Sequence, residues 1–401
     1  MNFNDEPKLF HYTCKLKDNK KISDAGYCDP YTGGNSFDKK RSEMKALGEA
    51  IERYSLSIYK NSNLITTSYE KIKNKALNPN DVVVVSKKQL AKKQYEKFRI
   101  DEKSKIRWAR GYSIKQKKNI YVPAQMVYVP YAYFKGEKLI QLPITTGAAT
   151  STTMSGAIYR GICEIVERDA YMIAYLNKLK LKKISNSHPL IKDIAKYFER
   201  YNLELHLFET TTDINIPCFM GILIDRTGEG PAVSVGLSAN LDAETAAIGA
   251  IEEAQHSRPW MREMYLKGDR FKGSWKNLTS LEQRGLLWYD QKMIKYLDFW
   301  LKIKGKKWKI QKRKSKGTIQ DLKTALNRLK NKETIVVDCT IPEIRRKGFK
   351  VVKVIIPELH PLFLFENVKY LGGKRIYEVP PKLGYKRKTE VQLNKIPHPF
   401  L

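Results

Sequence analysis

The chain of 401 residues is short of acidic side chains, cysteine and histidine, and each shortage excludes a class of protein. Only 42 Asp and Glu stand against 74 Lys and Arg, and the resulting net charge of +32 indicates a surface that attracts phosphate, nucleic acid or an acidic partner. The five cysteines are scattered and odd in number. They therefore exclude a disulfide framework and a cysteine zinc site, and they predict reduced, buried thiols. The six histidines are isolated, so the sequence identifies no general base.

Long apolar runs and phosphate-binding glycine loops are also missing. No segment approaches the roughly 18 uncharged apolar residues of a membrane helix, and the start of the chain lacks a targeting pattern. We therefore expect a cytoplasmic protein with no membrane partner. Neither the P-loop nor the protein-kinase glycine pattern occurs between a strand and a helix, so a bound ATP would occupy a less common fold.

The patterns that are present predict a substantial core and an α+β fold. Hydrophobic residues make up 42% of the chain, enough for one large or two to three smaller domains. Helical and strand patterns mix without strict alternation, which favours α+β. We predict a turn-rich loop at 28–36 and a small-residue loop at 145–155. The expected helices cover about 40–59, 156–176 and 243–264, and the expected strands are 121–123, 126–130, 139–143, 205–208, 219–224, 334–338 and 350–357.

A basic segment interrupts this organisation. Residues 302–316 hold nine basic side chains and no acid, with Trp308 among them, and an amphipathic helix is predicted over 318–330. Such a run is either a nucleic-acid patch or a solvated face, and the solvated face is the commoner outcome. The charge excess would also suit a heat-loving host. We expect one domain over 1–401, in which 265–332 is a basic helical segment and a candidate insertion.

The most informative feature is a small pattern that occurs three times. It reads Glu-Ala-Ile-Glu-Arg at 49–53, Glu-Ile-Val-Glu-Arg-Asp at 164–169 and Glu-Glu-Ala-Gln at 252–255, the last followed by Arg258. Residues three and four apart share a helix face, so one copy would be a surface ion pair worth only ~0.3–0.5 kcal/mol. Three copies favour a Mg²⁺ site, because Mg²⁺ binds a few carboxylates together with substrate phosphates. The arginines would then hold phosphate oxygens.

These motifs resemble the YcaO family, ATP-dependent enzymes that activate backbone amides of peptides. The likeness covers most of the chain and includes the three carboxylate motifs, the strand at 121–124 and the closing segments 337–340 and 351–357. The resemblance implies a YcaO-type fold with mixed sheets, in which three carboxylate-bearing helices converge on an ATP and Mg²⁺ site.

Carried over residue by residue, the resemblance implies both metal and nucleotide ligands. The Mg²⁺ ligands would be Glu49, Glu52, Glu164, Glu167 and Glu252, and the phosphate contacts would be Arg53, Arg168, Gln255 and Arg258. The sequence departs from the family at Lys45, where a serine is usual, and at residues 33–36, which replace a Gly-Lys-Gly loop. We expect further nucleotide contacts from this region, at Ser36, Lys39 or Lys45.

The resemblance also implies the reaction: a nucleophile adds to a peptide carbonyl, and ATP phosphorylates the resulting oxyanion. Azoline-forming members usually end in Pro-x-Pro-x-Pro, whereas residues 396–401 have one Pro-x-Pro. We therefore expect thioamide formation, for example thioglycine in methyl-coenzyme M reductase of a methane-producing archaeon, by an enzyme without a fused leader-binding domain. The alternatives are an azoline-forming cyclodehydratase of the same family and a basic RNA-binding or RNA-modifying protein.

The same resemblance implies partners. We expect a peptide or protein substrate, a TfuA-type sulfur-delivery partner and a homodimer, and no nucleic acid. Two further side chains lie among the motifs. Cys163 is expected to be a small core residue, with a persulfide carrier as the alternative, and His256 is expected to be structural although it follows Gln255.

Overall fold

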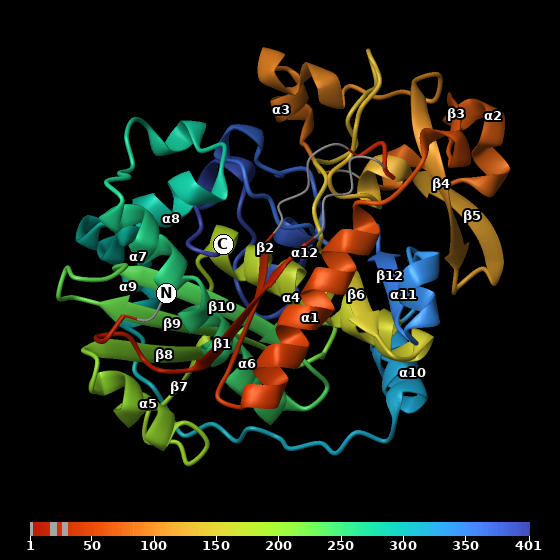
Figure 1. The fold of residues 1–401 in the computed structure, drawn as a ribbon. Helices are drawn as coiled ribbons and strands as arrows, with labels where there is room; N and C mark the ends of the chain where they lie inside the picture. Colours follow the sequence, from red (N-terminus) through yellow and green to blue (C-terminus); the bar gives the residue numbers. More distant parts are fainter. Residues whose placement is uncertain (1–2, 17–21, 26–30, 83) are drawn as a thin grey trace.

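The computed structural model describes residues 3–16, 22–25, 31–82 and 84–401, and these form an α+β fold as predicted (Figure 1). Three sheets are present in this part of the chain, and every strand pair in them is antiparallel. The fold has long helices between and across these sheets, and the candidate site lies where three of those helices meet.

The largest sheet has six strands in the order β3-β4-β11-β12-β6, with β5 paired to β4. It joins segments that lie far apart in the chain, because β11 pairs with β4 and β12 pairs with β6. The predicted strands at 334–338 and 350–357 are confirmed. The bounds are β3 Ile65–Ser68, β4 Lys105–Ser113, β5 Lys118–Pro123, β6 Ala148–Ser151, β11 Ile335–Asp338 and β12 Lys350–Ile355.

The second sheet has four strands in the order β10-β9-β8-β7, and the helix α6 packs on β9 and β10. The close approach needs a glycine: a Cβ added at Gly236 would lie 2.1 Å from the backbone nitrogen of Ala254 on α6. The strands predicted at 205–208 and 219–224 are confirmed. The bounds are β7 Lys182–Ile184, β8 Leu203–Glu209, β9 Cys218–Asp225 and β10 Val233–Ala239.

A short hairpin of β1 (Phe10–Lys15) and β2 (Tyr31–Ser36) packs on the helix α1. The loop predicted at 28–36 is wrong for its last six residues, which form β2, whereas Cys28 to Pro30 lie outside the described residues. The glycines that suggested a turn, Gly33 and Gly34, instead allow β2 to lie close to neighbouring elements. A Cβ at Gly34 would lie 2.2 Å from the carbonyl oxygen of Ser42 on α1.

Three capped helices supply the site. They are α1 (Lys39–Leu56), α4 (Met154–Asn177) and α6 (Ala243–His256), and their N-cap side chains are Asp38, Thr153 and Asp242. The first two helices match the prediction. The third was predicted to continue to 264, but it ends at His256 and a separate helix α7 (Arg258–Leu266) follows, with a proline in its first turn.

The other helices are short, and two predicted strands do not form. Residues 126–130 and 139–143 lie outside the strands because their backbone amides bond elsewhere. Val127 and Tyr128 donate to the Ala124 carbonyl oxygen in a turn, and Ile140 and Leu142 donate to the side chains of Gln125 and Tyr370. The basic segment crosses the molecule as irregular chain between α9 and α10 (Figure 1). The remaining helices are α2 Tyr69–Ile72, α3 Lys87–Leu90, α5 Lys192–Glu199, α8 Leu281–Tyr289, α9 Asp298–Leu301, α10 Thr318–Leu329, α11 Pro342–Arg346 and α12 Arg375–Lys382.

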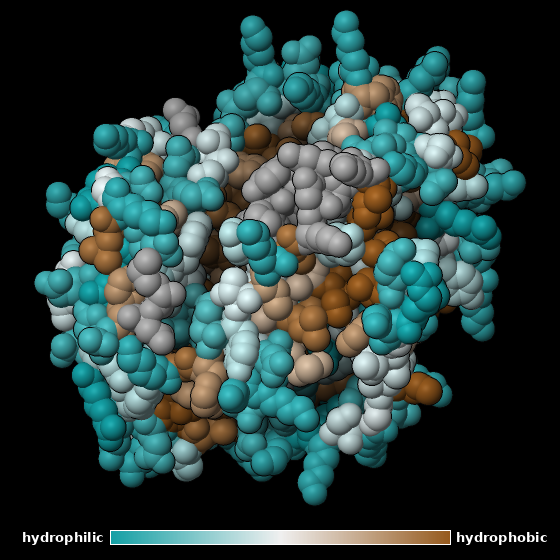
Figure 2. Space-filling model, in the orientation of Figure 1, coloured by the Kyte–Doolittle hydropathy of each residue, from teal (hydrophilic) through white to brown (hydrophobic). Residues whose placement is uncertain are grey.

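Burial agrees with these layers. The centre of α4 lies in the core, where Tyr171, Met172 and Ile173 are fully buried. Figure 2 shows a mostly hydrophilic face with hydrophobic residues gathered over α1, where Met44 and Leu47 are exposed. Among the helices that the structure describes, none combines the length and the apolar character that a membrane crossing requires.

Candidate nucleotide and metal site

The first group of site residues lies where α1 and α4 pack against β12 and β6. It contains Glu49, Glu52 and Glu164, three of the predicted Mg²⁺ ligands. Backbone amides orient two of these side chains: Gly33 donates to Glu49 Oε2 at 3.1 Å, and Gly147 donates to Glu164 Oε2 at 3.0 Å. Helical spacing brings Arg53 to Glu49 with an N–O distance of 2.7 Å. The structure thus gathers residues from two repeats of the sequence motif.

Glu52 is the most perturbed member of this group. Burial raises its pKa well above the ordinary value, and the neighbouring carboxylates of Glu164 and Glu49 raise it further. Two nearby cations, Arg53 and Lys353, act in the opposite direction but do not cancel the shift. Burial and the neighbouring carboxylates thus favour the protonated form of Glu52, and a bound divalent cation would supply the positive charge that favours its carboxylate.

Lys353 on β12 is a site residue that the sequence did not suggest. Only 1% of it is exposed, and its ammonium group donates to the carbonyl oxygen of Ile144. Burial lowers its pKa to about 8, against the opposing pull of Glu164 and Glu52. The sequence around Lys353 has the pattern of an ordinary buried strand. Lys353 is recognised as a site residue only from the position of β12 beside α1 and α4.

A second group shares Glu164 and adds Glu167, Arg168 and Glu253. The Arg168 guanidinium lies 3.4 Å from Glu167, 3.6 Å from Glu164 and 3.9 Å from Glu253. Burial raises the pKa of Glu167 to about 8; Arg168 lowers it, and Glu253 and Glu164 raise it. Nε, the atom nearest Glu167, forms an ion pair without hydrogen-bond geometry, and Nη1 is buried without a hydrogen-bond acceptor among the described residues. A guanidinium with unused donors fits an oxyanion such as phosphate.

Glu253 is the second residue that the sequence analysis missed. Its carboxylate accepts from the backbone nitrogen of Leu237 at 2.7 Å, and burial raises its pKa. Glu252 was predicted instead. Two adjacent glutamates on a helix point about 100° apart, and the one-sided pattern of α6 did not decide which of them faces α4.

Glu252 belongs to a third group beside the β2–α1 junction. Its Oε1 accepts from Ser36 Oγ at 2.6 Å and from the backbone nitrogen of Phe37 at 3.1 Å, and its Oε2 lies 2.6 Å from Lys45 Nζ. Gln255 is buried beside it, accepting from Asn35 Nδ2 at 2.8 Å. The structure thus brings the predicted residues Ser36, Lys45, Glu252 and Gln255 together. The carboxylate of Glu252, a predicted Mg²⁺ ligand, is bound here by donors of the protein itself.

Arg258 belongs to a separate cluster of buried charges. Arg258 is fully buried, and its guanidinium donates to Glu6 at 2.8 and 2.9 Å and to Asp225 at 3.0 Å. The predicted phosphate contact of Arg258 therefore requires correction, because these acidic partners already hold its charge inside the fold. Lys39 is the exposed first residue of α1.

The last residues of the sequence pack into the site. The Phe400 ring, 3% exposed, lies 4.1 Å from the guanidinium carbon of Arg168. Tyr175 on α4 donates to the carbonyl oxygen of Pro397 at 2.8 Å, and Arg284 donates to that of His398 at 2.6 Å. Residues 397–400 are thus buried partners of α4.

Two other side chains near the motifs, Cys163 and His256, pack against protein neighbours. Cys163 is buried as expected, and burial raises its pKa to about 12, which disfavours the thiolate that a sulfur carrier needs. His256 packs on the ring of His11 with a centroid distance of 5.2 Å, and burial lowers its pKa to about 4. Neither residue presents a free reactive group.

The donor set fits Mg²⁺ together with phosphate rather than a metal held by protein alone. Within the described residues, no three acidic, histidine or cysteine side chains form a ready-made metal cluster. Mg²⁺ usually takes one or two carboxylates and completes its shell with water and substrate phosphates. The crowded carboxylates of Glu52 and Glu164, next to the unused donors of Arg168, match that arrangement.

Comparisons with known proteins agree with this chemistry. The family model described as YcaO cyclodehydratase, ATP- and Mg²⁺-binding, matches residues 33–360. An uncharacterised protein of Methanothermobacter thermautotrophicus is 24% identical over 229 residues, which is 56% of each chain. An uncharacterised protein in the tfuA 3′ region of Rhizobium leguminosarum bv. trifolii is 30% identical over 166 residues, 38% of this chain and 39% of that one. The matches thus span about half or less of these relatives.

Solved structures share the fold. A heterocyclase in complex with substrate and cofactor superposes with a TM-score of 0.76 at 23% identity, over 97% of this chain and 54% of that chain. A protein of Methanopyrus kandleri described as YcaO bound with AMPPCP and Mg²⁺ gives a TM-score of 0.60 at 16% identity, over 82% of this chain and 79% of that chain.

Proposed function

The chain belongs to the YcaO family, and from that premise we propose that it is an enzyme that activates a peptide backbone amide and then incorporates sulfur. ATP and Mg²⁺ are the cofactors of this family. Bound ATP would supply the phosphoryl group that turns the amide oxygen into a leaving group. The observation that carries the proposal is the pairing of crowded, buried carboxylates on α1 and α4 with the unused donors of Arg168.

We assign the cofactor-holding roles to side chains of both carboxylate groups. Glu49, Glu52, Glu164 and Glu167 would hold Mg²⁺, with Glu253 beside them, because their negative charge exceeds that of the adjacent cations. Arg168 would bind phosphate oxygens through Nη1, and Arg53 would add a second cation at the edge of the first group. Ser36, Lys45 and Gln255 would border the nucleotide from the β2–α1 junction.

Thioamide formation is the finer part of the proposal. One relative is described by its place beside tfuA. This supports external sulfide as the nucleophile, with a TfuA-type protein as a proposed partner and a glycine amide, such as that of methyl-coenzyme M reductase, as a proposed substrate. The heterocyclase likeness supports the alternative, azoline formation, at the level of the fold.

Mass spectrometry of peptides after incubation with enzyme, ATP, Mg²⁺ and sulfide tests this proposal. Thioamide formation predicts a product in which one oxygen is replaced by sulfur, formed only when ATP and sulfide are both present. A Glu164→Gln variant serves as the inactive control. A product that has lost one water without sulfide would instead identify the azoline reaction, and unmodified peptides with full ATP turnover would count against both.

A further inference from the structure

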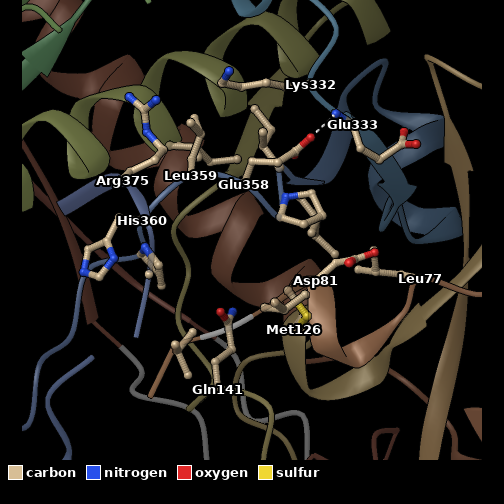
Figure 3. Close-up of a pocket in the computed structure, with 18 of the residues that line it drawn as sticks. Leu77, Asp81, Met126, Gln141, Lys332, Glu333, Glu358, Leu359, His360 and Arg375 are labelled. Atoms are coloured by element: carbon tan, nitrogen blue, oxygen red, sulfur yellow. Dashed lines mark hydrogen bonds between the residues drawn. The ribbon is translucent and has the colours of Figure 1, made fainter. Parts of the chain in front are cut away.

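A cavity of about 760 Å³ lies beside the end of β12, outside the carboxylate groups described above (Figure 3). Most of its wall comes from residues 76–82, 141–146, 353–361 and 373–382, and residues 115–126 and 332–333 contribute to the rest. The volume lies within the roughly 300–1,000 Å³ typical of ligand sites. The sequence motifs do not point to it, because its lining comes from loops and strand ends that are far apart in the chain.

Part of the cavity wall is formed by the two chain segments that also contact the carboxylates of the site. Lys353 and Ile144 both line it, and the Lys353 ammonium donates to the Ile144 carbonyl oxygen while it interacts with Glu52 and Glu164. Thr146 also lines the cavity, and the next residue, Gly147, donates to Glu164. A molecule in the cavity would therefore contact the segment that positions Glu164.

Gln141 marks this cavity as a binding site. Its side chain is only 7% exposed, lines the cavity and has no hydrogen-bond partner among the described residues. Figure 3 shows it directed into the cavity, between Met126 and His360. Its amide is therefore available to a molecule in the cavity, and a primary amide offers donors and an acceptor side by side. The matching ligand is another amide group, which also carries a donor and an acceptor.

The charges around the cavity argue against an anion as the ligand. Four acidic side chains and five lysines line the cavity, and Arg375, which also lines it, pairs with Asp169 and Asp213. The lining therefore carries little net positive charge. Apolar side chains such as Leu77, Met126 and Ile355 make up much of the remaining wall. The acidic lining residues are Asp81, Glu333, Glu358 and Glu378, and the lysines are Lys115, Lys332, Lys353, Lys374 and Lys382.

We propose that this cavity binds an extended segment of the substrate polypeptide, and that Gln141 hydrogen-bonds one of its backbone amide groups. The wall from Thr146 to Lys353 would bring the neighbouring carbonyl to the carboxylate groups. This proposal rests on the proposed function, because it assigns the substrate path of the same site. It makes Gln141 a substrate-binding residue with no role in holding the nucleotide.

Photo-crosslinking tests the assignment. The probe is a capped oligoglycine peptide with one central diazirine-leucine, added to the full chain with Mg²⁺ and a non-hydrolysable ATP analogue. We expect crosslinks within 76–82, 141–146 or 353–361. Gln141→Leu should reduce them roughly threefold to tenfold, the loss of one or two neutral hydrogen bonds. The control Gln116→Leu removes a rim amide that already donates to Glu333 at 2.6 Å, and should leave the yield unchanged.

Crosslinks elsewhere, or equal yields in Gln141→Leu and wild type, would overturn the assignment. A competition measurement on the wild type keeps the test independent of variant folding: unlabelled capped oligoglycine should suppress the cavity crosslinks, whereas suppression by inorganic phosphate alone would overturn the peptide ligand. Calorimetry with the ATP analogue separates the two proposals. Absent nucleotide binding with cavity labelling retained would refute the proposed function alone, and intact binding with labelling elsewhere would refute the cavity assignment alone.

Discussion

The ring of Phe400 lies 4.1 Å from the guanidinium carbon of Arg168, although 232 positions separate them in the sequence. The Arg168 guanidinium thus contacts the aromatic ring of Phe400 as well as the carboxylates of Glu167 and Glu253. The arginine is thereby held in place, while its Nη1 has no hydrogen-bond acceptor among the described residues. The end of the sequence is thus part of the site that α4 builds.

Phe400→Ala should weaken nucleotide binding. A desolvated cation–π contact contributes about 1–2 kcal/mol, so the affinity for Mg²⁺ and an ATP analogue should fall roughly fivefold to thirtyfold in calorimetry. Phe299→Ala is the matched control, because its ring faces Lys178 instead. A variant that loses thermal stability but keeps wild-type nucleotide affinity would show that Phe400 only fills space.

Arg258→Ala should lower the stability of the fold and leave nucleotide binding unchanged. Removing the guanidinium leaves Glu6 and Asp225 buried without their cation, which costs about 3–5 kcal/mol of unfolding free energy. Nucleotide affinity per folded molecule should stay at the wild-type value. Denaturant unfolding and calorimetry on the same sample check both expectations, and a selective loss of ATP binding would restore the phosphate role predicted from the sequence.

Lys353→Met should make stability depend more strongly on Mg²⁺. Without the ammonium, the carboxylates of Glu52 and Glu164 repel one another, and the protein in EDTA should lose roughly 2–4 kcal/mol. Adding Mg²⁺ with the ATP analogue should recover most of that loss. Lys369→Met, which breaks a 2.6 Å pair with the buried Glu366, should destabilise the fold without recovery by Mg²⁺. Equal recovery in both variants would contradict a shared charge balance.

The helical part of the site could be predicted from sequence, and the tertiary part could not. Glu49, Glu52, Glu164 and Glu167 repeat at helical spacing, and such periodicity is local information. The helices α1 and α4 were predicted for the same reason. The loop predicted at 28–36 was wrong for 31–36 because its glycines serve a close helix contact.

The residues that sequence reasoning missed take their roles from distant partners. Lys353 is a site residue only because β12 lies beside α1 and α4, and Glu253 instead of Glu252 faces Arg168 because of the way α6 lies on its sheet. Arg258 has the right spacing, but its partners Glu6 and Asp225 come from other elements. No local pattern encodes these pairings.

His206 should make the protein sensitive to acid. Burial lowers its pKa from 6.5 to about 4, so the unfolded chain takes up this proton at a higher pH than the folded chain does. The stability that neutral His206 provides is therefore complete above about pH 6.5 and is lost as the pH falls toward 4. Over that window wild type should lose about 1.4 kcal/mol per pH unit relative to His206→Gln.

Denaturant unfolding of the two proteins at several pH values checks this. The comparison uses the difference between them because the raised pKa of Glu167, present in both, makes an opposite contribution that cancels. A constant difference from pH 7 to pH 4.5 would contradict a buried neutral imidazole at position 206.

Isothermal titration calorimetry of Glu164→Gln is the most direct test of the account, since Glu164 belongs to both carboxylate groups and a neutral amide is a poorer Mg²⁺ ligand. Glu263→Gln is the control, because that glutamate pairs with Lys267 on the surface of α7. Glu164→Gln should bind the ATP analogue at least about tenfold more weakly in the presence of Mg²⁺, a cost of about 1.4 kcal/mol or more, while Glu263→Gln should bind as wild type does. Wild-type affinity in Glu164→Gln would contradict it.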